Sequence, residues 1–540
     1  MSAPAPVLTP TTAAHLAADL AALPYTTAAV EELLGPMALQ ALDREHAEPA
    51  RAVIAGILAD PDPQVPRHRL AGVVSVWLLG DAVPAALLDA ALPRLGVTGA
   101  LAARLVGPAA ADGGDEAAAD DEARQPATVR GLVDLSAYET DSPGPLWVAS
   151  DQTALQRRGP LPADHVLGIG RASLTLAGAV DRSPADTALD LGTGCGIQTL
   201  HLLAHVRHVT ATDLSPRCLA FTRFNLLLNA EVLGLDRAHL EERVELLAGD
   251  LLEPVAGRTF ERIVTNPPFV ITPRGDAAAP VLTYRDGGRE GDRLVAELIQ
   301  RAPEHLQPGG TLTMLANWEI HAHGDSMARV REWIGTQAAA WLIQRDRQDP
   351  AGYAETWLQD SSLELDPGQY QRRYTDYLED FAARGVAAVG FGYLWLRRPL
   401  AGQPVWHVTE EITQPIDASI GPAWAAGVRR RDRVAAPQAR DGAPWEQLHL
   451  RVAPDVTEER HARFGAEHPE VILARQGSGF RRVARLDTAT AGVLSAADGE
   501  LSIAQLVGAV VALLELDDAG AHALGAAVRG LFEDGFLVEA

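Results

Sequence analysis

The feature that most constrains this chain is an alternation of short β-rich runs with helical stretches between about residues 161 and 345. The β-rich runs are TALDLG, HVTATD, VELLAGD, RIVTNP and TLTMLAN. Such alternation is typical of an α/β fold in which crossover helices join parallel strands. In open α/β sheets, ligands bind outside the carboxyl ends of the strands. The residues that directly follow each run are therefore the first candidates for a functional site.

A glycine-rich loop follows the first of these runs. Asp190 precedes Gly192, Gly194 and Gly196, and the helical stretch IQTLHLLAHV begins directly after them. Glycine permits positive φ and lets the backbone approach a ligand closely, and a helix N-terminus offers unpaired N–H groups. A dinucleotide site would have the spacing GxGxxG. The spacing here is GxGxG, with an acid two residues before the first glycine, which indicates a different nucleoside ligand.

Acidic residues end the next two runs. Asp213 ends HVTATD, and Asp250 ends VELLAGD, with Leu251 directly after it. An acid at the tip of the second strand can accept hydrogen bonds from ribose hydroxyls. Each acid alone would also suit a helix cap or a loop. Their spacing within one α/β series favours a role in binding a cofactor.

The motif Asn266-Pro267-Pro268-Phe269 follows the fourth run. Proline fixes φ and lacks an N–H, so we expect carbonyl oxygens that are free to accept hydrogen bonds, next to the amide oxygen of Asn266. Acceptors that face one NH₂ group orient its nitrogen, and these hydrogen bonds strengthen as the nitrogen becomes more acidic during transfer. Phe269 would stack on a planar amide or base. These four residues are the candidate catalytic group.

Together the two motifs resemble class I S-adenosylmethionine-dependent methyltransferases, over about residues 160 to 320. The NPPF motif is similar to the (N/D)PP(F/Y/W) signature of release-factor glutamine (N5) methyltransferases, N6-adenine enzymes and rRNA base methyltransferases. The resemblance implies a Rossmann-like domain with a mostly parallel seven-stranded sheet and S-adenosyl-L-methionine as cofactor. It assigns cofactor contacts to Asp190, Gly192, Gly194, Gly196, Asp213, Asp250 and Leu251. It also implies that a segment at Gly168 passes under the methionine end of the cofactor, although a plain turn is an equal alternative.

Three acceptor classes stay open. The favoured acceptor is a glutamine side-chain amide of a protein partner, because the segments 284–294 and QPGGTL resemble the glutamine methyltransferases. The net charge of −25 also disfavours binding to the phosphate backbone of a nucleic acid. The alternative is a nucleobase amine in RNA or DNA, because Phe269 stands where the glutamine enzymes usually have Tyr, and the C-terminal segment carries local arginines. A small-molecule acceptor is less favoured, since the flanking segments are large.

Composition divides the rest of the chain. We expect a helical, possibly winged-helix-like N-terminal domain over 1–107, an acidic low-complexity linker over 108–127 and a β-rich connector over 128–160. The class I domain would span 161–429, with an aromatic-rich insert over 349–384 that either packs or forms a lid. A small α+β, winged-helix-like domain would span 430–540.

The remaining sequence features concern metal binding, membrane insertion and cellular compartment. Cys195 and Cys218 belong to no CxxC pair or Cys/His cluster, so neither a disulfide framework nor a metal site is expected. No segment offers roughly 18 uninterrupted apolar residues, and the N-terminus lacks a signal-peptide pattern. We expect a cytoplasmic protein without membrane contact, and the sequence does not indicate its oligomeric state.

Overall fold

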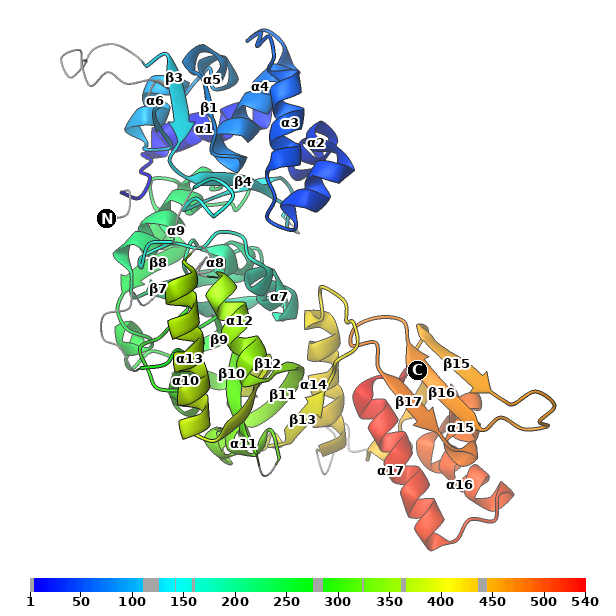
Figure 1. Cartoon of the computed structure of the whole chain (residues 1–540). Helices are drawn as coiled ribbons and strands as arrows, with labels where there is room; N and C mark the ends of the chain where they lie inside the picture. Colours follow the sequence, from blue (N-terminus) through cyan, green and yellow to red (C-terminus); the bar gives the residue numbers. More distant parts are fainter. Residues whose placement is uncertain are drawn as a thin grey trace.

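The computed structural model describes residues 4–109, 126–140, 142–157, 161–274, 285–322, 325–360, 366–435 and 444–540. Most of the linker expected at 108–127 lies outside the described residues, as does Tyr284. Figure 1 shows three lobes in chain order, with the N-terminal and C-terminal lobes on different sides of a central α/β lobe.

An eight-stranded sheet forms the central lobe, in the order β13-β11-β12-β10-β9-β6-β7-β8. The strands are β6 (Ala185–Leu191), β7 (Val206–Asp213), β8 (Val244–Ala248), β9 (Phe260–Thr265), β10 (Leu306–His321), β11 (Ala339–Gln348), β12 (Val386–Arg397) and β13 (His407–Glu411). The run from β8 to β10 is parallel, whereas β12 runs antiparallel between β10 and β11. The predicted mostly parallel α/β sheet is confirmed. It has eight strands rather than seven, because β13 pairs with β11 at the far edge.

Helices cover both faces of this sheet. Successive strand residues point to opposite faces, so β10 places Met314 in one hydrophobic core and Leu315 in the other. The first face carries α10 (Arg293–Arg301) and α11 (Ala328–Ile334). The second carries α7 (Arg171–Ala179), α8 (Ile197–Leu202), α9 (Pro216–Leu228) and α14 (Gly421–Ala435). Packed helices therefore support the strands of the sheet from both faces.

The N-terminal lobe is mainly helical. Its elements are α1 (Pro10–Ala22), α2 (Thr27–Leu42), α3 (Glu48–Ile57), α4 (Pro66–Val73), the π-helix η1 (Val74–Leu78), β1 (Ala82–Pro84), α5 (Ala85–Ala91), α6 (Gly96–Ala102) and β2 (Val106–Pro108). Strand β3 (Thr128–Gly131) pairs between β1 and β2, so the start of the expected connector belongs to this lobe's small sheet.

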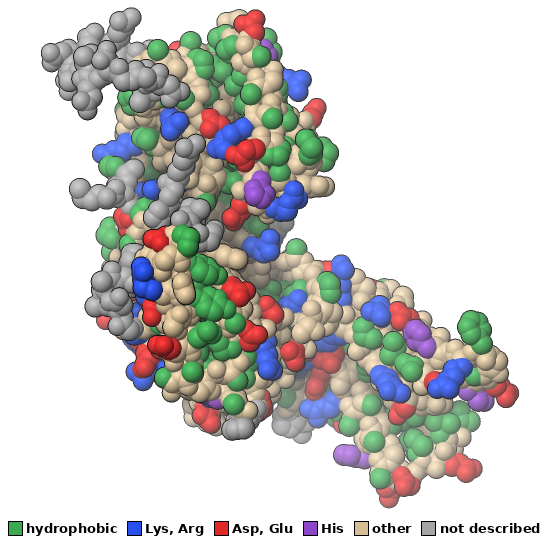
Figure 2. Space-filling model, in the orientation of Figure 1, with side chains coloured by type: hydrophobic (Ala, Val, Ile, Leu, Met, Phe, Trp, Pro, Cys, Tyr) green, Lys and Arg blue, Asp and Glu red, His purple; other side chains and the backbone are tan. Residues whose placement is uncertain are grey.

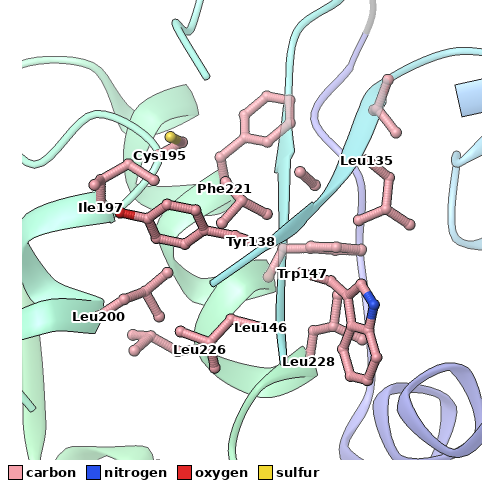
Figure 3. Close-up of a cluster of buried hydrophobic side chains, with 14 of the residues drawn as sticks. Leu135, Tyr138, Leu146, Trp147, Cys195, Ile197, Leu200, Phe221, Leu226 and Leu228 are labelled. Carbon is pink, nitrogen blue, oxygen red and sulfur yellow. The ribbon is translucent and has the colours of Figure 1, made fainter. Parts of the chain in front are cut away.

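A β-hairpin joins this lobe to the central one. It consists of β4 (Asp134–Tyr138) and β5 (Leu146–Ser150). Asn225 of α9 and Asn229, which caps the C-terminus of that helix, each accept a backbone N–H from β5 and donate to a β5 carbonyl, at 2.7–3.0 Å. Figure 3 shows Tyr138 of the hairpin beside residues of α8. The two lobes thus share one hydrophobic core.

The insert at 349–384 forms two helices, α12 (Pro350–Asp360) and α13 (Pro367–Ala383). The C-terminal lobe contains β14 (His449–Val452), β15 (Val456–His461), β16 (Val471–Gln476), β17 (Val483–Leu486), α15 (Thr488–Ser495), β18 (Asp498–Ser502), α16 (Ile503–Leu513), α17 (Asp518–Asp534) and β19 (Leu537–Glu539). Phe480 of this lobe lies against Trp341 and Trp424 of the central lobe, at 5.7 and 6.1 Å between ring centroids. The winged-helix character of the terminal lobes stays a prediction.

Within the described ranges, no single helix has the length and apolar composition to cross a membrane, although the bent pair α5 and α6 meets that criterion jointly. Both cysteines are free thiols, and Cys195 is buried.

Candidate active site

The candidate residues gather at the carboxyl ends of four neighbouring strands. The glycine loop follows β6, Asp213 ends β7, Asp250 comes two residues after β8, and Asn266 directly follows β9. These strands lie side by side in the parallel order β9-β6-β7-β8. Because their carboxyl ends meet at one edge, the fold brings together residues that are far apart in the sequence.

The three glycines after β6 all have left-handed backbone conformations. Their φ angles are +75° at Gly192, +59° at Gly194 and +95° at Gly196. A Cβ added to Gly192 or Gly194 would meet no atom of the described residues within 4 Å, whereas one on Gly196 would lie 3.1 Å from Thr222 Cγ2. The first two glycines therefore border open space, and the third packs against α9. This is the cradle that a closely approaching ligand requires.

Asp213 holds this loop in place. Its Oδ2 accepts the Gly194 N–H at 2.9 Å, and its Oδ1 accepts the Ser215 N–H at 2.8 Å. Thr222 donates from its hydroxyl to the Gly194 carbonyl at 2.9 Å. A carboxylate accepts at about four lone-pair sites, so Asp213 retains capacity for hydroxyl donors. Burial raises the pKa of Asp213, although the two backbone N–H groups oppose that effect.

Asp190 lies behind the loop. It is 1% exposed and accepts hydrogen bonds from the hydroxyls of Thr193 at 2.7 Å and Thr199 at 2.6 Å. Burial raises the pKa of Asp190 to about 6, while the threonine hydroxyls lower it. These contacts join the glycine loop to α8. A direct cofactor contact for Asp190 stays a prediction.

The other predicted cofactor residues have separate surroundings. Asp250 is partly exposed and pairs with Arg289 at 3.2 Å, which links β8 to the Gly-Gly segment before α10. Leu251 has a φ of +46° and packs against the sheet core that carries α10. Gly168 packs closely on β5, because an added Cβ would lie 2.4 Å from the Ser150 hydroxyl. Its close neighbour in this structure is therefore the hairpin.

The Asn266 side chain presents an unusual acceptor. Its Oδ1 is buried and has no hydrogen-bond partner among the described residues. A buried polar atom without a partner is costly, and such atoms mark places where a ligand completes the hydrogen bonding. The expectation of free proline carbonyls was wrong in part. Pro267 O accepts the Phe269 N–H at 2.7 Å within the motif itself. Pro268 O accepts the Gly287 N–H at 3.0 Å, because the loop lies against the 285–288 segment.

A pocket of about 480 Å³ lies beside Phe269. Leu315, Phe391 and Tyr393 form much of its apolar wall. Its two charged lining residues are already engaged. Arg345 donates to the carbonyls of Ile412 and Gln414, and Asp417 accepts the Gly479 N–H and pairs with Arg481. The pocket therefore suits an uncharged group next to the NPPF motif.

The strand order, the glycine cradle and the acidic strand ends define a class I methyltransferase domain. Residues 168–332 match the family model of the methyltransferase small domain. Residues 22–120 match a model described as a domain of unknown function, DUF7059. The resemblance drawn from the sequence motifs is thus confirmed for the central domain.

Relatives of this domain are named glutamine methyltransferases. The release factor glutamine methyltransferase of Geobacter sulfurreducens is 34% identical over 25% of this chain and 46% of its own length. The ribosomal protein uL3 glutamine methyltransferase of Bradyrhizobium diazoefficiens is 32% identical over 28% of this chain and 47% of its own length. The chain spans about half the length of these relatives. An rRNA methylase structure from Streptococcus thermophilus is also similar, at 18% identity over 43% of this chain and 98% of that one, with a TM-score of 0.23.

Sequence reasoning missed several residues that organise the site. Asn225 donates both to β5 and to the Cys195 carbonyl in the glycine loop, at 2.8 Å for the latter. Asn317 of β10 and Tyr353 of α12 contact each other near the loop that follows the NPPF motif. The aromatic composition of the insert was the only signal for Tyr353, and it does not reveal where the hydroxyl points.

Proposed function

We propose that this protein is an S-adenosylmethionine-dependent N-methyltransferase whose acceptor is the side-chain amide of a glutamine in a protein partner. The observation that carries the proposal is the buried Oδ1 of Asn266 at the carboxyl end of β9, which has no hydrogen-bond partner among the described residues. The names of the matched relatives support the same acceptor.

The cofactor would lie over the glycine loop. When bound, S-adenosylmethionine supplies an electrophilic methyl group on its sulfonium. Gly192 and Gly194 leave room for close backbone approach, and Asp213 keeps lone pairs for ribose hydroxyls. Asp250 stands at the next strand end, where it would approach the adenine side. The donor set and the open cradle therefore fit this cofactor.

Asn266 would orient the acceptor nitrogen. Its Oδ1 accepts one N–H of the planar amide and so directs the face of the nitrogen toward the methyl group. As the nitrogen pyramidalises, its N–H becomes a stronger donor, and the hydrogen bond stabilises the transition state more than the ground state. Phe269 would pack against the amide plane. As the N–CH₃ bond forms, the sulfonium S–CH₃ bond would break and the nitrogen would lose one amide proton to water, so no side chain of raised basicity is needed before transfer.

A protein acceptor also agrees with the surroundings of the arginines. Arg475, Arg481 and Arg482 pair with Glu459, Asp417 and Glu410 at 2.6–2.7 Å. Figure 2 shows basic and acidic side chains interspersed over the described part of the visible face. A phosphate backbone is bound by a cluster of available cations, and these three are engaged within the chain.

The test is transfer of radiolabelled methyl from S-adenosylmethionine into a lysate of cells that lack this enzyme, followed by protease or nuclease treatment. The expected result is label that protease removes and nuclease does not, with a methylated glutamine in the labelled protein. Label that nuclease removes would show a nucleobase acceptor instead. Loss of labelling with Asn266→Ala, at unchanged cofactor binding, would place the transfer at this site.

A further inference from the structure

The helical insert reaches the acceptor loop through one hydroxyl. Tyr353 of α12 is fully buried, and its hydroxyl accepts the backbone N–H of Ile271 at 2.8 Å. Ile271 is two residues beyond Phe269 in the loop that leaves the NPPF motif. The side-chain amide of Asn317, also fully buried, donates to the same hydroxyl at 3.0 Å. One atom thus joins the acceptor loop to strand β10.

The ring of Tyr353 supports the pocket wall. It stacks on Phe391 with 5.7 Å between centroids and an interplanar angle of 27°. Phe391 and Phe269 both line the 480 Å³ pocket, and both pack against the aromatic cluster of the insert. Leu315, which also lines the pocket, points to the same sheet face as Asn317 because strand side chains alternate. Tyr353 therefore contacts the loop, the sheet and the pocket wall together.

The contact with Ile271 fixes the loop without touching the reacting atoms. Ile271 is 1% exposed, so its N–H has little access to water as a replacement partner. A buried N–H that loses its acceptor tends to move until it finds another. Movement at Ile271 would be passed to Phe269 and Asn266 along a short stretch of backbone. Methyl transfer is sensitive to displacements of about 1 Å, which cost on the order of 100-fold in rate.

We propose that Tyr353 is a positioning residue for the acceptor site: its hydroxyl sets the loop that carries Asn266 and Phe269, and its ring sets Phe391. This inference rests on the proposed methyl-transfer function of the same site. It gives the insert at 349–384 a function, since α12 contributes the anchor for the NPPF loop.

The test compares Tyr353→Phe with Tyr374→Phe in the full-length protein. The first variant keeps the ring and removes the hydroxyl. The second removes a hydroxyl from the same insert, where it donates to the exposed Glu355 at 3.1 Å. We expect kcat to fall on the order of 10- to 100-fold in Tyr353→Phe, with the Kd for S-adenosylmethionine unchanged. Tyr374→Phe should match wild type.

Backbone hydrogen exchange over residues 269–274 gives a readout that does not depend on activity. Exchange should accelerate in Tyr353→Phe and stay at the wild-type rate in Tyr374→Phe. Wild-type exchange and kcat in Tyr353→Phe would overturn the proposal, as would an equal loss of cofactor affinity. If wild type transfers no methyl to any lysate component, the proposed function fails, and the exchange measurement still decides whether Tyr353 holds the loop.

Discussion

Substitution of Gly194 by alanine separates the cost of backbone strain from the cost of filling the proposed cofactor cradle. Gly194 has a φ of +59°, and an added Cβ would meet no atom of the described residues within 4 Å. The substitution therefore introduces no clash with the described part of the chain. Its cost to folding is the left-handed conformation of a non-glycine residue, about 1–2 kcal/mol, offset in part by a less flexible unfolded chain.

Gly234 is a matched control. It has a φ of +65°, and an added Cβ would also meet nothing within 4 Å in the part of the chain that the structure describes. It lies in the exposed turn after α9, away from the carboxyl edge of the sheet. The same strain argument therefore predicts an equal loss of unfolding free energy for Gly234→Ala. The two variants share a left-handed φ and space for the added methyl group, and they differ in what that methyl group faces.

The assay is calorimetric titration with S-adenosylmethionine beside denaturant unfolding of both variants. We expect both to lose about 1 kcal/mol of unfolding free energy. Gly194→Ala alone should weaken cofactor binding by about tenfold or more, which corresponds to 1.4 kcal/mol. Equal cofactor affinity in both variants would show that the space beside Gly194 is not the cofactor cradle, and the reasoning from the glycine loop would be refuted.

Three further predictions concern other parts of the site. Asn266→Ala should lower kcat by on the order of 100- to 1,000-fold and leave the cofactor Kd unchanged; retained activity in a single-turnover assay would contradict its role. The pKa of Asp190 is raised to about 6 by burial, so its ionisation lowers stability as pH rises from about 4 through 6. Asp190→Asn should therefore gain stability relative to wild type across that window, by up to about 3 kcal/mol; parallel pH–stability curves would rule this out. Asp417→Ala removes the partner of Arg481 and of the Gly479 N–H at the pocket rim. It should raise the KM for the protein acceptor more than the cofactor Kd, and steady-state kinetics with both substrates varied would show an equal change if this is wrong.

Local patterns in the sequence were sufficient for the centre of the fold. The five β-rich runs are strands β6 to β10, and the GxGxG spacing marks the three left-handed glycines. These features depend on short stretches of chain, since strand periodicity and positive φ are properties of a few neighbouring residues. The parallel arrangement then places Asp213 and Asn266 at one edge without further information.

Local sequence patterns did not predict which side chains are buried or which groups pair with one another. Asp190 is an acid two residues before a glycine in the sequence, but only the packed structure shows that it lies behind the loop, bound to Thr193 and Thr199. The carbonyls of Pro267 and Pro268 were expected to be free, and the contact with Gly287 depends on how a later segment returns to the motif. The sequence did not show whether Arg475, Arg481 and Arg482 are paired, because their partners Glu459, Asp417 and Glu410 are brought to them only by the fold.

The sequence by itself determined the alternation of strands and helices, the left-handed glycines after β6 and the NPPF motif after β9, because each strand, loop or motif is a pattern of neighbouring residues. The tertiary structure alone decided which distant residues hold those motifs in place. Tyr353 and Ile271 are 82 positions apart, and Asn225 and Ala149 are 76 apart. Such contacts arise when the sheet and its helices pack, so they depend on the folded arrangement of the whole chain rather than on any local pattern.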